Sequence, residues 1–305
     1  MKACVWNCRG LGGPSTVSQL KEAWRFHLPD ILCVCETKKK MAFVKTVCRN
    51  LKVGSNWHCV DPSGLSGGML VCWKESIKVL QVISNSFCVE VECEYSIGLG
   101  SLWVVFVYAS PDDQTRLGQW DFLVSAKQKW GDNWILGGDF NDIRCHEEKR
   151  GGNKRADSSF INFNNFISNM AMVEIPLVSG EFTWTNNRQK ENFVEEKLDM
   201  FFGSSQWQLS YPTAKVFHNN LTSSDHCLLT LVAAPTTPKL KRRFAFDSRW
   251  LEKKDFRAQV ERAWNLPVGA TLMFQVHSRI RNCRIELLKW NRGGHEIQLQ
   301  TRVAL

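Results

Sequence analysis

The sequence predicts a layered α/β or α+β domain of about 235 residues, followed by a basic tail. The first part alternates short apolar runs with amphipathic segments, as strands and helices do when they cover one another. The segment 69–108 holds four strand-like runs with short connections, and 44% of the residues are apolar. Mixed sheets covered by helices satisfy all three observations.

Net charge divides the chain in the same way. Residues 1–234 contain 24 basic and 24 acidic residues, whereas residues 235–305 contain 15 and 6, so the tail carries the whole excess of nine. We therefore expect one domain over 1–234 and a basic, partly helical tail over 235–305. Basic segments often follow phosphate backbones, although a solvated helix or a linker explains the charge equally well.

Strands are expected where apolar runs end at turn residues. They cover 2–6, 31–35, 69–73, 78–84, 87–95, 102–108, 134–136, 197–202, 214–217 and 228–232, with a short strand or turn at 183–185. Helices are expected over about 16–27, 41–51, 115–129, 158–170 and 249–264. We expect Ser15 or Thr16 to cap the first helix and Ser158 the fourth. The four runs of 69–108 should pair as one antiparallel meander.

The twelve cysteines form no CxxC pair and no zinc-finger spacing, so we interpret them as reduced, mostly buried thiols. No signal peptide or membrane-spanning run is evident. These features favour an intracellular protein without a membrane partner.

The stretch from Trp134 to Asn141 is the most informative. An apolar run indicates a buried strand, and the glycine pair at 137–138 is expected to mark its end. Asp139 and Asn141 would project at that end or just after it. An Asx turn is the structural alternative.

Other polar residues also follow or precede apolar strands. They are Asn7, Glu36, Tyr108, Asp199, Asp225 and His226. In layered α/β folds, ligands bind where strand ends meet loops. Carboxylates with an amide suit Mg²⁺, and a histidine beside aspartates suits proton transfer or anion stabilisation. This set favours metal-assisted attack of water on a phosphoester, and no P-loop or serine-nucleophile motif competes with it.

Six motifs in order resemble the endonuclease/exonuclease/phosphatase superfamily, which includes deoxyribonuclease I, exonuclease III and apurinic/apyrimidinic endonucleases. They are Trp6-Asn7-x-x-Gly10, Glu36-Thr37, Tyr108-x-x-Pro111, Gly138-Asp139-Phe140-Asn141, Leu198-Asp199 and Ser224-Asp225-His226. The resemblance covers about residues 1–233 and implies a four-layer sandwich of two mixed β-sheets flanked by helices.

Longer motifs resemble the endonuclease domain of plant LINE-type (non-LTR) retrotransposons. They are Trp6-Asn7-Cys8-Arg9-Gly10-Leu11-Gly12, Thr183-Trp184-Thr185-Asn186-Asn187 and Phe244-x-Phe246-x-x-x-Trp250-Leu251. In those elements a reverse transcriptase normally follows, and this chain has none, so it resembles a fragment or a truncated gene model. Lys197 and Met200 flank the late Leu-Asp pair where the family usually has other residues, and Arg9 disfavours a dedicated repair enzyme.

The resemblance also implies roles for single residues. Glu36 would be the main Mg²⁺ ligand, with Asn7 and Asp225 on the metal side and Mn²⁺ as an alternative ion. Asp139 would orient or deprotonate the attacking water, and Asn141 would hold that water or the phosphate. His226 would stabilise the phosphate charge and Asp199 would orient His226. Tyr108 would contact the scissile phosphate, and Trp184 would stack against a nucleotide.

The expected function is therefore a Mg²⁺-dependent, apurinic-endonuclease-like enzyme that nicks DNA for a LINE-type retroelement, acting in the nucleus if its substrate is genomic. A phosphomonoesterase or small phosphodiesterase of the same fold is one alternative. The other is a non-catalytic retroelement fragment. In either case the tail is a candidate for binding RNA or DNA, and no obligate protein partner is indicated.

Overall fold

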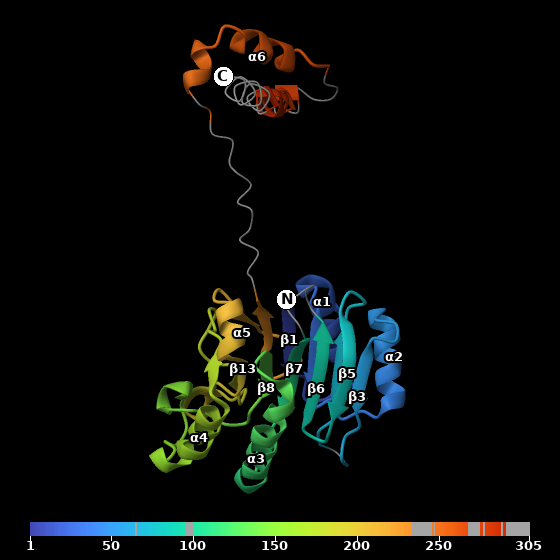
Figure 1. Cartoon of the computed structure of the whole chain (residues 1–305), viewed down its shortest axis with the longest axis vertical. Coiled ribbons are helices and arrows are strands. Elements are labelled where there is room, and N and C mark those ends of the chain that lie inside the picture. The colour runs from blue at the N-terminus through green and yellow to red at the C-terminus, as the bar shows by residue number, and fades with distance from the viewer. Residues whose placement is uncertain are drawn as a thin grey trace. The chain divides into compact units, whose positions relative to one another are not determined.

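The computed structural model describes residues 1–64, 66–94, 101–233, 246, 248–267, 275–276, 278–287 and 289–290. The chain forms two compact units, Met1–Pro235 and Thr236–Leu305 (Figure 1). That the second unit is a basic tail linking to a further domain stays a prediction.

The first unit contains two six-stranded mixed sheets within the described residues. One sheet has the order β14-β15-β1-β2-β4-β3. Its strands are β1 (Lys2–Asn7), β2 (Ile31–Cys35), β3 (Trp57–Val60), β4 (Met69–Trp73), β14 (Lys215–Asn219) and β15 (Leu228–Val232). Only β1 and β2 run parallel among these neighbours, with Asn7 opposite Cys35.

The second sheet has the order β10-β13-β8-β7-β6-β5. Its strands are β5 (Lys78–Ser84), β6 (Cys88–Glu94), β7 (Ser101–Tyr108), β8 (Trp134–Asp139), β10 (Met172–Glu174) and β13 (Asp199–Ser204). Strands β7 and β8 are parallel, and the helix α3 (Asp113–Trp130) joins them as a crossover. The carboxyl ends of β7 and β8 therefore lie together at one edge.

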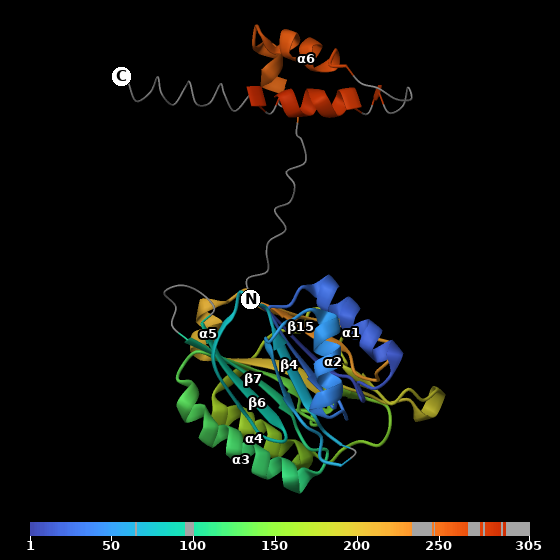
Figure 2. The same cartoon turned by 90° about the vertical axis from the view of Figure 1, so that its right-hand side faces the viewer.

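The two sheets pack face to face, and helices cover their outer faces (Figure 2). Helices α1 (Pro14–His27) and α2 (Met41–Leu51) lie on the β1-containing sheet, whereas α3 and α4 (Ile161–Met170) lie on the other. Alternation along the strands explains this arrangement: Val5 points between the sheets, while Trp6 packs under α1 and α2. The expected four-layer sandwich is confirmed.

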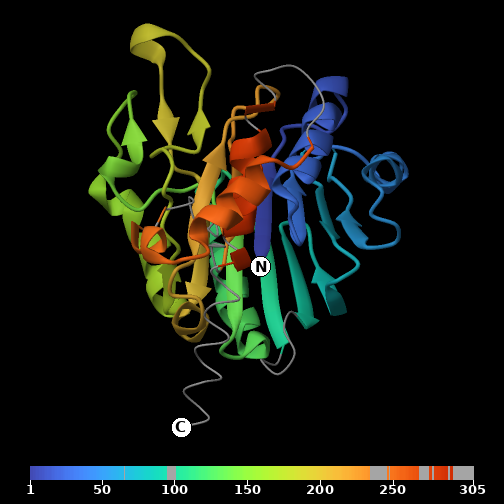
Figure 3. The ribbon, with the colours of Figure 1, turned by 90° about the horizontal axis from the view of Figure 1, so that it is seen from above.

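Smaller elements complete the unit. They are α5 (Ser205–Ser210), the 3₁₀ turns η1 (His146–Glu148), η2 (Asp157–Phe160) and η3 (Lys190–Asn192), and the strands β9 (Lys149–Arg150), β11 (Trp184–Thr185) and β12 (Glu195–Glu196). The three strands form a small sheet in the order β11-β12-β9. Its β11–β12 connection projects from the sandwich (Figure 3).

The glycine pair lies inside β8 and does not mark its end, contrary to the expectation from sequence. A Cβ on Gly137 would lie 2.2 Å from the Phe201 ring, and one on Gly138 would lie 1.9 Å from the Val107 carbonyl oxygen. The glycines therefore let β8 pack closely against its neighbours on both sides. Asp139 is the last residue of the strand.

The predicted meander is wrong in its first strand. Strand β4 pairs with β2 and β3 in the other sheet, and only β5, β6 and β7 form a meander. All five residues of β4 are buried, whereas β5 alternates between half-buried and exposed positions at a sheet edge. Strand β3, the strand just before β4 in the sequence, is the neighbour with which β4 pairs, and it was not among the predicted strands.

Two predicted helix caps are also wrong. Helix α1 follows Gly13 and begins with Pro14, whose fixed φ suits the first helical position, and no side chain caps it. Helix α4 continues from η2, so Ser158 lies within a preceding 3₁₀ turn. Helix α3 does have a side-chain cap, because Asp112 accepts a hydrogen bond from the Thr115 amide.

The second unit contains η4 (Ser248–Glu252) and α6 (Phe256–Trp264). The single helix predicted over 249–264 is therefore interrupted between these two elements. Phe246, Trp250 and Phe256 form edge-to-face ring contacts, and Lys253 lies 4.7 Å from the Trp290 ring centroid. Of the retroelement-like motif in this region, Phe244 lies outside the described residues. Among those that are described, no helix has the length and apolar character needed to cross a membrane.

Candidate active site

Three polar side chains lie on one rung of the β7–β8–β13 sheet. Tyr108 is paired with Asp139 across the parallel strands, and Asp139 is paired with Asp199 across the antiparallel strands. Both carboxyl groups are buried, each residue being 1% exposed. The pairing brings together two carboxylates that are 60 residues apart in the sequence. Buried charges of one sign require a compensating partner.

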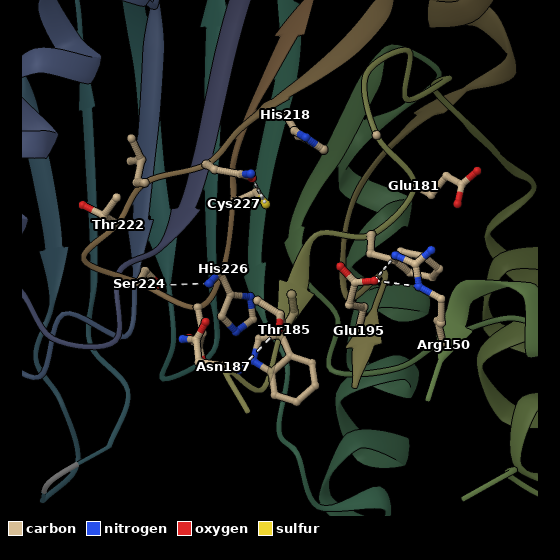
Figure 4. A pocket seen from close by; sticks show the side chains of 16 residues that line it. Arg150, Glu181, Thr185, Asn187, Glu195, His218, Thr222, Ser224, His226 and Cys227 are labelled. Atoms are coloured by element: carbon tan, nitrogen blue, oxygen red, sulfur yellow. Dashed lines mark hydrogen bonds and ion pairs between the residues drawn. The ribbon is translucent and has the colours of Figure 1, made fainter. Parts of the chain in front are cut away.

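His226 is that partner. Its Nδ1 lies 2.9 Å from Asp199 Oδ2, and its Nε2 lies 3.8 Å from Asp139 Oδ2. The residue lies in the loop before β15. There Ser224 Oγ accepts a hydrogen bond from the His226 amide and donates one to the Asn7 carbonyl oxygen (Figure 4). Because Asp199 is an acceptor, Nδ1 carries the proton and Nε2 faces Asp139.

The electrostatic environment shifts the pKa of both groups. Burial opposes the charge on His226, but Asp199, Asp139 and Asp225 outweigh it and raise the pKa of this histidine to about 9. Burial raises the pKa of Asp139 to about 7, and the nearby Asp199 acts in the same direction, against the effect of His226. A cationic ring thus lies beside a carboxyl group that titrates near neutral pH, a combination suited to acid–base chemistry.

Two asparagines hold Asp139. Asn7 Nδ2, at the end of β1, donates to Asp139 Oδ2 at 2.8 Å. The Asn141 amide donates to Oδ1 at 2.9 Å, and Asn141 Nδ2 donates to the Ala109 carbonyl oxygen at 2.8 Å. Asn141 has φ of +49°, a left-handed conformation that asparagine tolerates better than most residues. Both carboxylate oxygens are therefore oriented by hydrogen bonds.

Glu36 lies at the same edge, on the other sheet. It follows Cys35, the last residue of β2, which is paired with Asn7 on β1. Its Oε1 forms an ion pair with Lys38 Nζ at 2.8 Å. Burial raises the pKa of the Tyr108 hydroxyl, and the charges of Glu36 and Asp139 raise it further, so all three groups share one electrostatic environment.

Asp225 contacts two side chains that are distant from it in the sequence. Arg9 forms an ion pair with it, and the Trp184 indole nitrogen donates to its Oδ2 at 3.0 Å. Asp225 Oδ1 is buried and has no hydrogen-bond partner among the described residues. Trp184 is half-buried, with its ring centroid 6.5 Å from that of His226.

The residues fit a hard divalent cation on the Glu36 side of the site. The donors there are oxygens: the Glu36 carboxylate, the Asn7 amide oxygen and the unpartnered Oδ1 of Asp225. Asp139, Asp199 and His226 also lie within 4.8 Å of one another. The carboxylates around His226 raise its pKa to about 9, and a protonated ring has no lone pair for a metal, so we interpret these three as a proton-sharing group.

The structure brings the predicted site residues to one edge of the sandwich. Hydrogen bonds join Asn7 and Asn141 to Asp139, and another joins His226 to Asp199. The 3.8 Å ion pair between His226 and Asp139 connects these two groups into one network. The Glu36 side chain forms an ion pair with Lys38, and the Trp184 side chain donates a hydrogen bond to Asp225, the residue next to His226 in the sequence.

Sequence reasoning missed four supporting residues, namely Arg9, Lys38, Thr183 and Ser224. Thr183 Oγ1 accepts hydrogen bonds from the amides of Leu198 and Asp199, at 3.0 and 2.9 Å. All four lie within or beside the quoted motifs, so their positions were visible in the sequence, but their contacts were not.

Fold and site together define a hydrolase of phosphate esters. The chain belongs to the Endonuclease/Exonuclease/phosphatase family, whose model matches residues 4–226. This confirms the resemblance at the level of the superfamily, and the likeness to plant LINE elements stays a prediction. No curated protein is similar enough in sequence to match.

Solved structures share the fold at low sequence identity. The 3′-5′ exonuclease NExo from Neisseria meningitidis has a TM-score of 0.60 and 17% identity, over 76% of this chain and 99% of its own. An AP endonuclease from Leishmania major has a TM-score of 0.58 and 16% identity, over 75% and 86%. The endonuclease domain of TRAS1, a telomere-specific non-LTR retrotransposon, has a TM-score of 0.57 and 14% identity, over 77% and 99%.

Proposed function

We propose that the chain is a divalent-metal-dependent endonuclease that nicks one strand of DNA and leaves a 3′-hydroxyl. The observation that carries this proposal is the buried Asp139–His226–Asp199 group, at the sheet edge that also holds Tyr108. A cationic ring beside a near-neutral carboxyl group suits in-line attack of water on a phosphodiester.

In this mechanism Asp139 accepts a proton from the attacking water, whose oxygen bonds to phosphorus. His226 donates a hydrogen bond from Nε2 to a non-bridging phosphate oxygen as negative charge develops there. The bond from phosphorus to the 3′ oxygen breaks, and that oxygen takes a proton from solvent. Asp199 keeps the ring protonated and oriented. Asn141 and Tyr108 hold the phosphate or the attacking water in line.

Magnesium, held by Glu36 with Asn7 and Asp225, would neutralise the charge of the phosphate, and Mn²⁺ would serve the same purpose. The oxygen donors on that side of the site support this assignment. Lys38 and Arg9, which pair with Glu36 and Asp225, would give up those contacts when the ion binds.

The role in a LINE-type retroelement is part of the same proposal. The long motif around Arg9 and the Thr183–Asn187 motif support it, and so does the fold shared with the TRAS1 domain. A free 3′-hydroxyl is what a reverse transcriptase needs to prime synthesis. Such an enzyme would act on genomic DNA in the nucleus.

The test is relaxation of supercoiled plasmid with and without Mg²⁺. We expect nicks only with metal, and DNA polymerase should extend the products from their 3′ ends. Glu36→Ala, Asp139→Ala and His226→Ala should each abolish nicking, whereas Glu75→Ala, a change at an exposed turn away from the site, should not. Nicking at the wild-type rate by the three site variants would refute the assignment.

A phosphomonoesterase is the second candidate. It is favoured by the balance of 24 basic and 24 acidic residues over 1–234, because proteins that hold a long phosphate backbone are usually basic there. A panel of 3′-phosphorylated oligonucleotides and inositol phosphates, assayed with the plasmid, separates the two. Release of phosphate without nicking would favour the second candidate.

A further inference from the structure

The segment that carries Glu36 has a backbone conformation that residues with a side chain rarely adopt. Glu36 has φ of +54°, and Lys38, two residues later, has φ of +51°. Left-handed conformations of this kind are unfavourable for both residue types, and they persist only where the surroundings over-determine them. The neighbours of this segment must therefore hold it in place.

Backbone hydrogen bonds hold the segment from two sides. On one side the Thr37 amide donates to the Gly68 carbonyl oxygen at 3.0 Å. The Lys38 amide donates in the same way to the Gly67 carbonyl oxygen, also at 3.0 Å. On the other side the Leu11 amide donates to the Thr37 carbonyl oxygen at 2.9 Å. The residue that follows the proposed metal ligand is thus bound between the loop after β1 and the connection from β3 to β4.

Gly68 permits the close approach of that connection. Its φ is +84°, and a Cβ at this position would lie 2.4 Å from Thr37 Oγ1. The Lys38 amide nitrogen and Pro62 Cβ would each lie 3.4 Å away, so an added methyl group meets atoms in three places. Thr37 cannot easily rotate aside, because it is β-branched and 0% exposed. The backbone of one segment or the other would have to move.

Two further observations allow this contact to be tested by itself. Thr37 Oγ1 is buried and has no hydrogen-bond partner among the described residues, so its removal breaks no hydrogen bond there. Gly67 has a similar φ of +77°, but a Cβ on it would have no described atom within 4 Å. Backbone strain and steric contact can therefore be separated at two adjacent glycines.

We propose that Gly68 is a positioning residue for Glu36: it sets where the carboxylate lies and thereby how tightly the site binds its divalent cation. The inference rests on the proposed role of Glu36 as the metal ligand. A methyl group on Gly68 displaces Thr37, and one peptide bond passes the displacement to Glu36. Residues that orient metal ligands contribute about 10- to 100-fold to metal affinity. Gly68 exerts this effect without touching the ion or the DNA.

Titration with Mn²⁺ in the absence of DNA tests the proposal. The full chain is titrated, and electron paramagnetic resonance measures the free ion. We expect Gly68→Ala to bind Mn²⁺ about 10- to 100-fold more weakly than the wild type. Gly67→Ala, which adds backbone strain without the contact, should bind like the wild type. Thr37→Ala should do so too, and adding it to Gly68→Ala should restore most of the affinity.

Thermal unfolding checks that each variant is folded. Wild-type affinity in Gly68→Ala would overturn the proposal, and so would an equal loss in Gly67→Ala, because backbone strain alone would then explain the effect. A double variant as weak as Gly68→Ala would exclude the contact with Thr37 as the cause. If Gly68→Ala does not fold, the double variant is compared with Thr37→Ala. Equal affinities then support the proposal, and a loss of about tenfold or more contradicts it.

Glu36→Gln separates this inference from the proposed function. If Glu36→Gln binds Mn²⁺ like the wild type, the proposed metal site fails and the role of Gly68 fails with it. If Glu36→Gln loses Mn²⁺ while Gly68→Ala keeps it, the metal site stands and only the role of Gly68 is refuted.

Plasmid nicking supplies a second readout. Gly68→Ala should need about 10- to 100-fold more Mg²⁺ for its half-maximal rate, and its rate at saturating Mg²⁺ should stay close to that of the wild type. A lower rate at saturating Mg²⁺ with an unchanged Mg²⁺ requirement would contradict a role in metal affinity. If the wild type nicks no DNA, the nuclease assignment fails, and the Mn²⁺ titration still decides the role of Gly68.

Discussion

Asp199 lies directly opposite Asp139 across β13 and β8, and His226 bridges the pair with one ring nitrogen toward each carboxylate. The two aspartates differ in their surroundings. Asp199 accepts the Nδ1 proton, whereas Asp139 receives hydrogen bonds from Asn7 and Asn141 and faces Nε2. One carboxylate is therefore committed to the histidine, and the other is available to substrate.

Replacing Asp199 with asparagine should separate these roles. The amide preserves the shape but removes the charge that raises the pKa of His226, so the ring becomes neutral at a lower pH. We expect nicking to slow about 10- to 100-fold, the usual effect of losing such a partner. NMR titration of the His226 ring should show the lower pKa. A pKa unchanged from that of wild type would contradict this account.

The rate of nicking should have a bell-shaped dependence on pH. Asp139 must be ionised to accept a proton, and His226 must be protonated to bind the phosphate. The pKa of Asp139 is about 7 and that of His226 about 9, so the rate should rise through about 7 and fall through about 9. In Asp199→Asn the alkaline limb should move to lower pH while the acid limb moves less.

The free energy of unfolding should also depend on the protonation of His226. Its pKa is raised from 6.5 to about 9 on folding, so the stabilisation it provides is complete below about 6.5 and is lost as pH rises through about 9. Asp139 has finished titrating by then, because its folded pKa is about 7. Urea unfolding in EDTA at pH 7 and pH 10 should show a loss in the wild type that His226→Gln lacks. Equal losses in both proteins would argue against the His226 contribution.

Metal binding should stabilise the folded protein through Glu36. A ligand at a hundred times its dissociation constant adds about 2.7 kcal/mol, so Mg²⁺ should raise the melting temperature of the wild type. Glu36→Gln should lose most of this shift, whereas Glu75→Gln should keep it. A full shift in Glu36→Gln would place the ion elsewhere.

A buried ion pair fixes the loops that follow β7 and β8. Arg116, on α3 and 4% exposed, binds Asp142 Oδ2 through Nε at 3.3 Å and donates from Nη1 to the Ser110 carbonyl oxygen at 2.8 Å. Arg116→Met leaves the Asp142 charge buried with Arg155 as its remaining cation. We expect a loss of about 3–5 kcal/mol in urea unfolding. Adding Asp142→Leu should recover part of it, and a further loss instead would refute the pairing.

The sequence was sufficient to predict which residues belong to the site, but it did not predict the hydrogen bonds and ion pairs between them. Asp139 and His226 belong to short motifs at the ends of apolar runs, and such positions are visible without a structure. The contacts of Arg9 with Asp225 and of Thr183 with Asp199 cross 216 and 16 residues, and no local pattern specifies them. The strand and helix pattern predicted mixed sheets covered by helices, and the family resemblance added the division into two sheets and four layers.

The errors have local physical causes. Strand β4 was assigned to the meander because neighbours in sequence usually pair, but β3, the neighbour with which it does pair, was not predicted from the sequence. The β8 glycines resembled a turn, but close packing against Phe201 and Val107 explains them inside a strand. The buried pair of Arg116 and Asp142 was not predicted from the sequence, since burial of an ion pair depends on which helix covers which loop.

Strands β1 and β15, at the two ends of the first unit's sequence, are paired neighbours in one sheet. Lys2 is paired with Val232, and the amide of Ala233 donates to the Met1 carbonyl oxygen at 2.8 Å. A ribosome releases β1 long before β15, so a growing chain cannot seat His226 until almost all of this unit has emerged. Interrupted synthesis would thus yield fragments in which His226 never joins Asp139 and Asp199, and the adjoining ends mark a natural position for circular permutation.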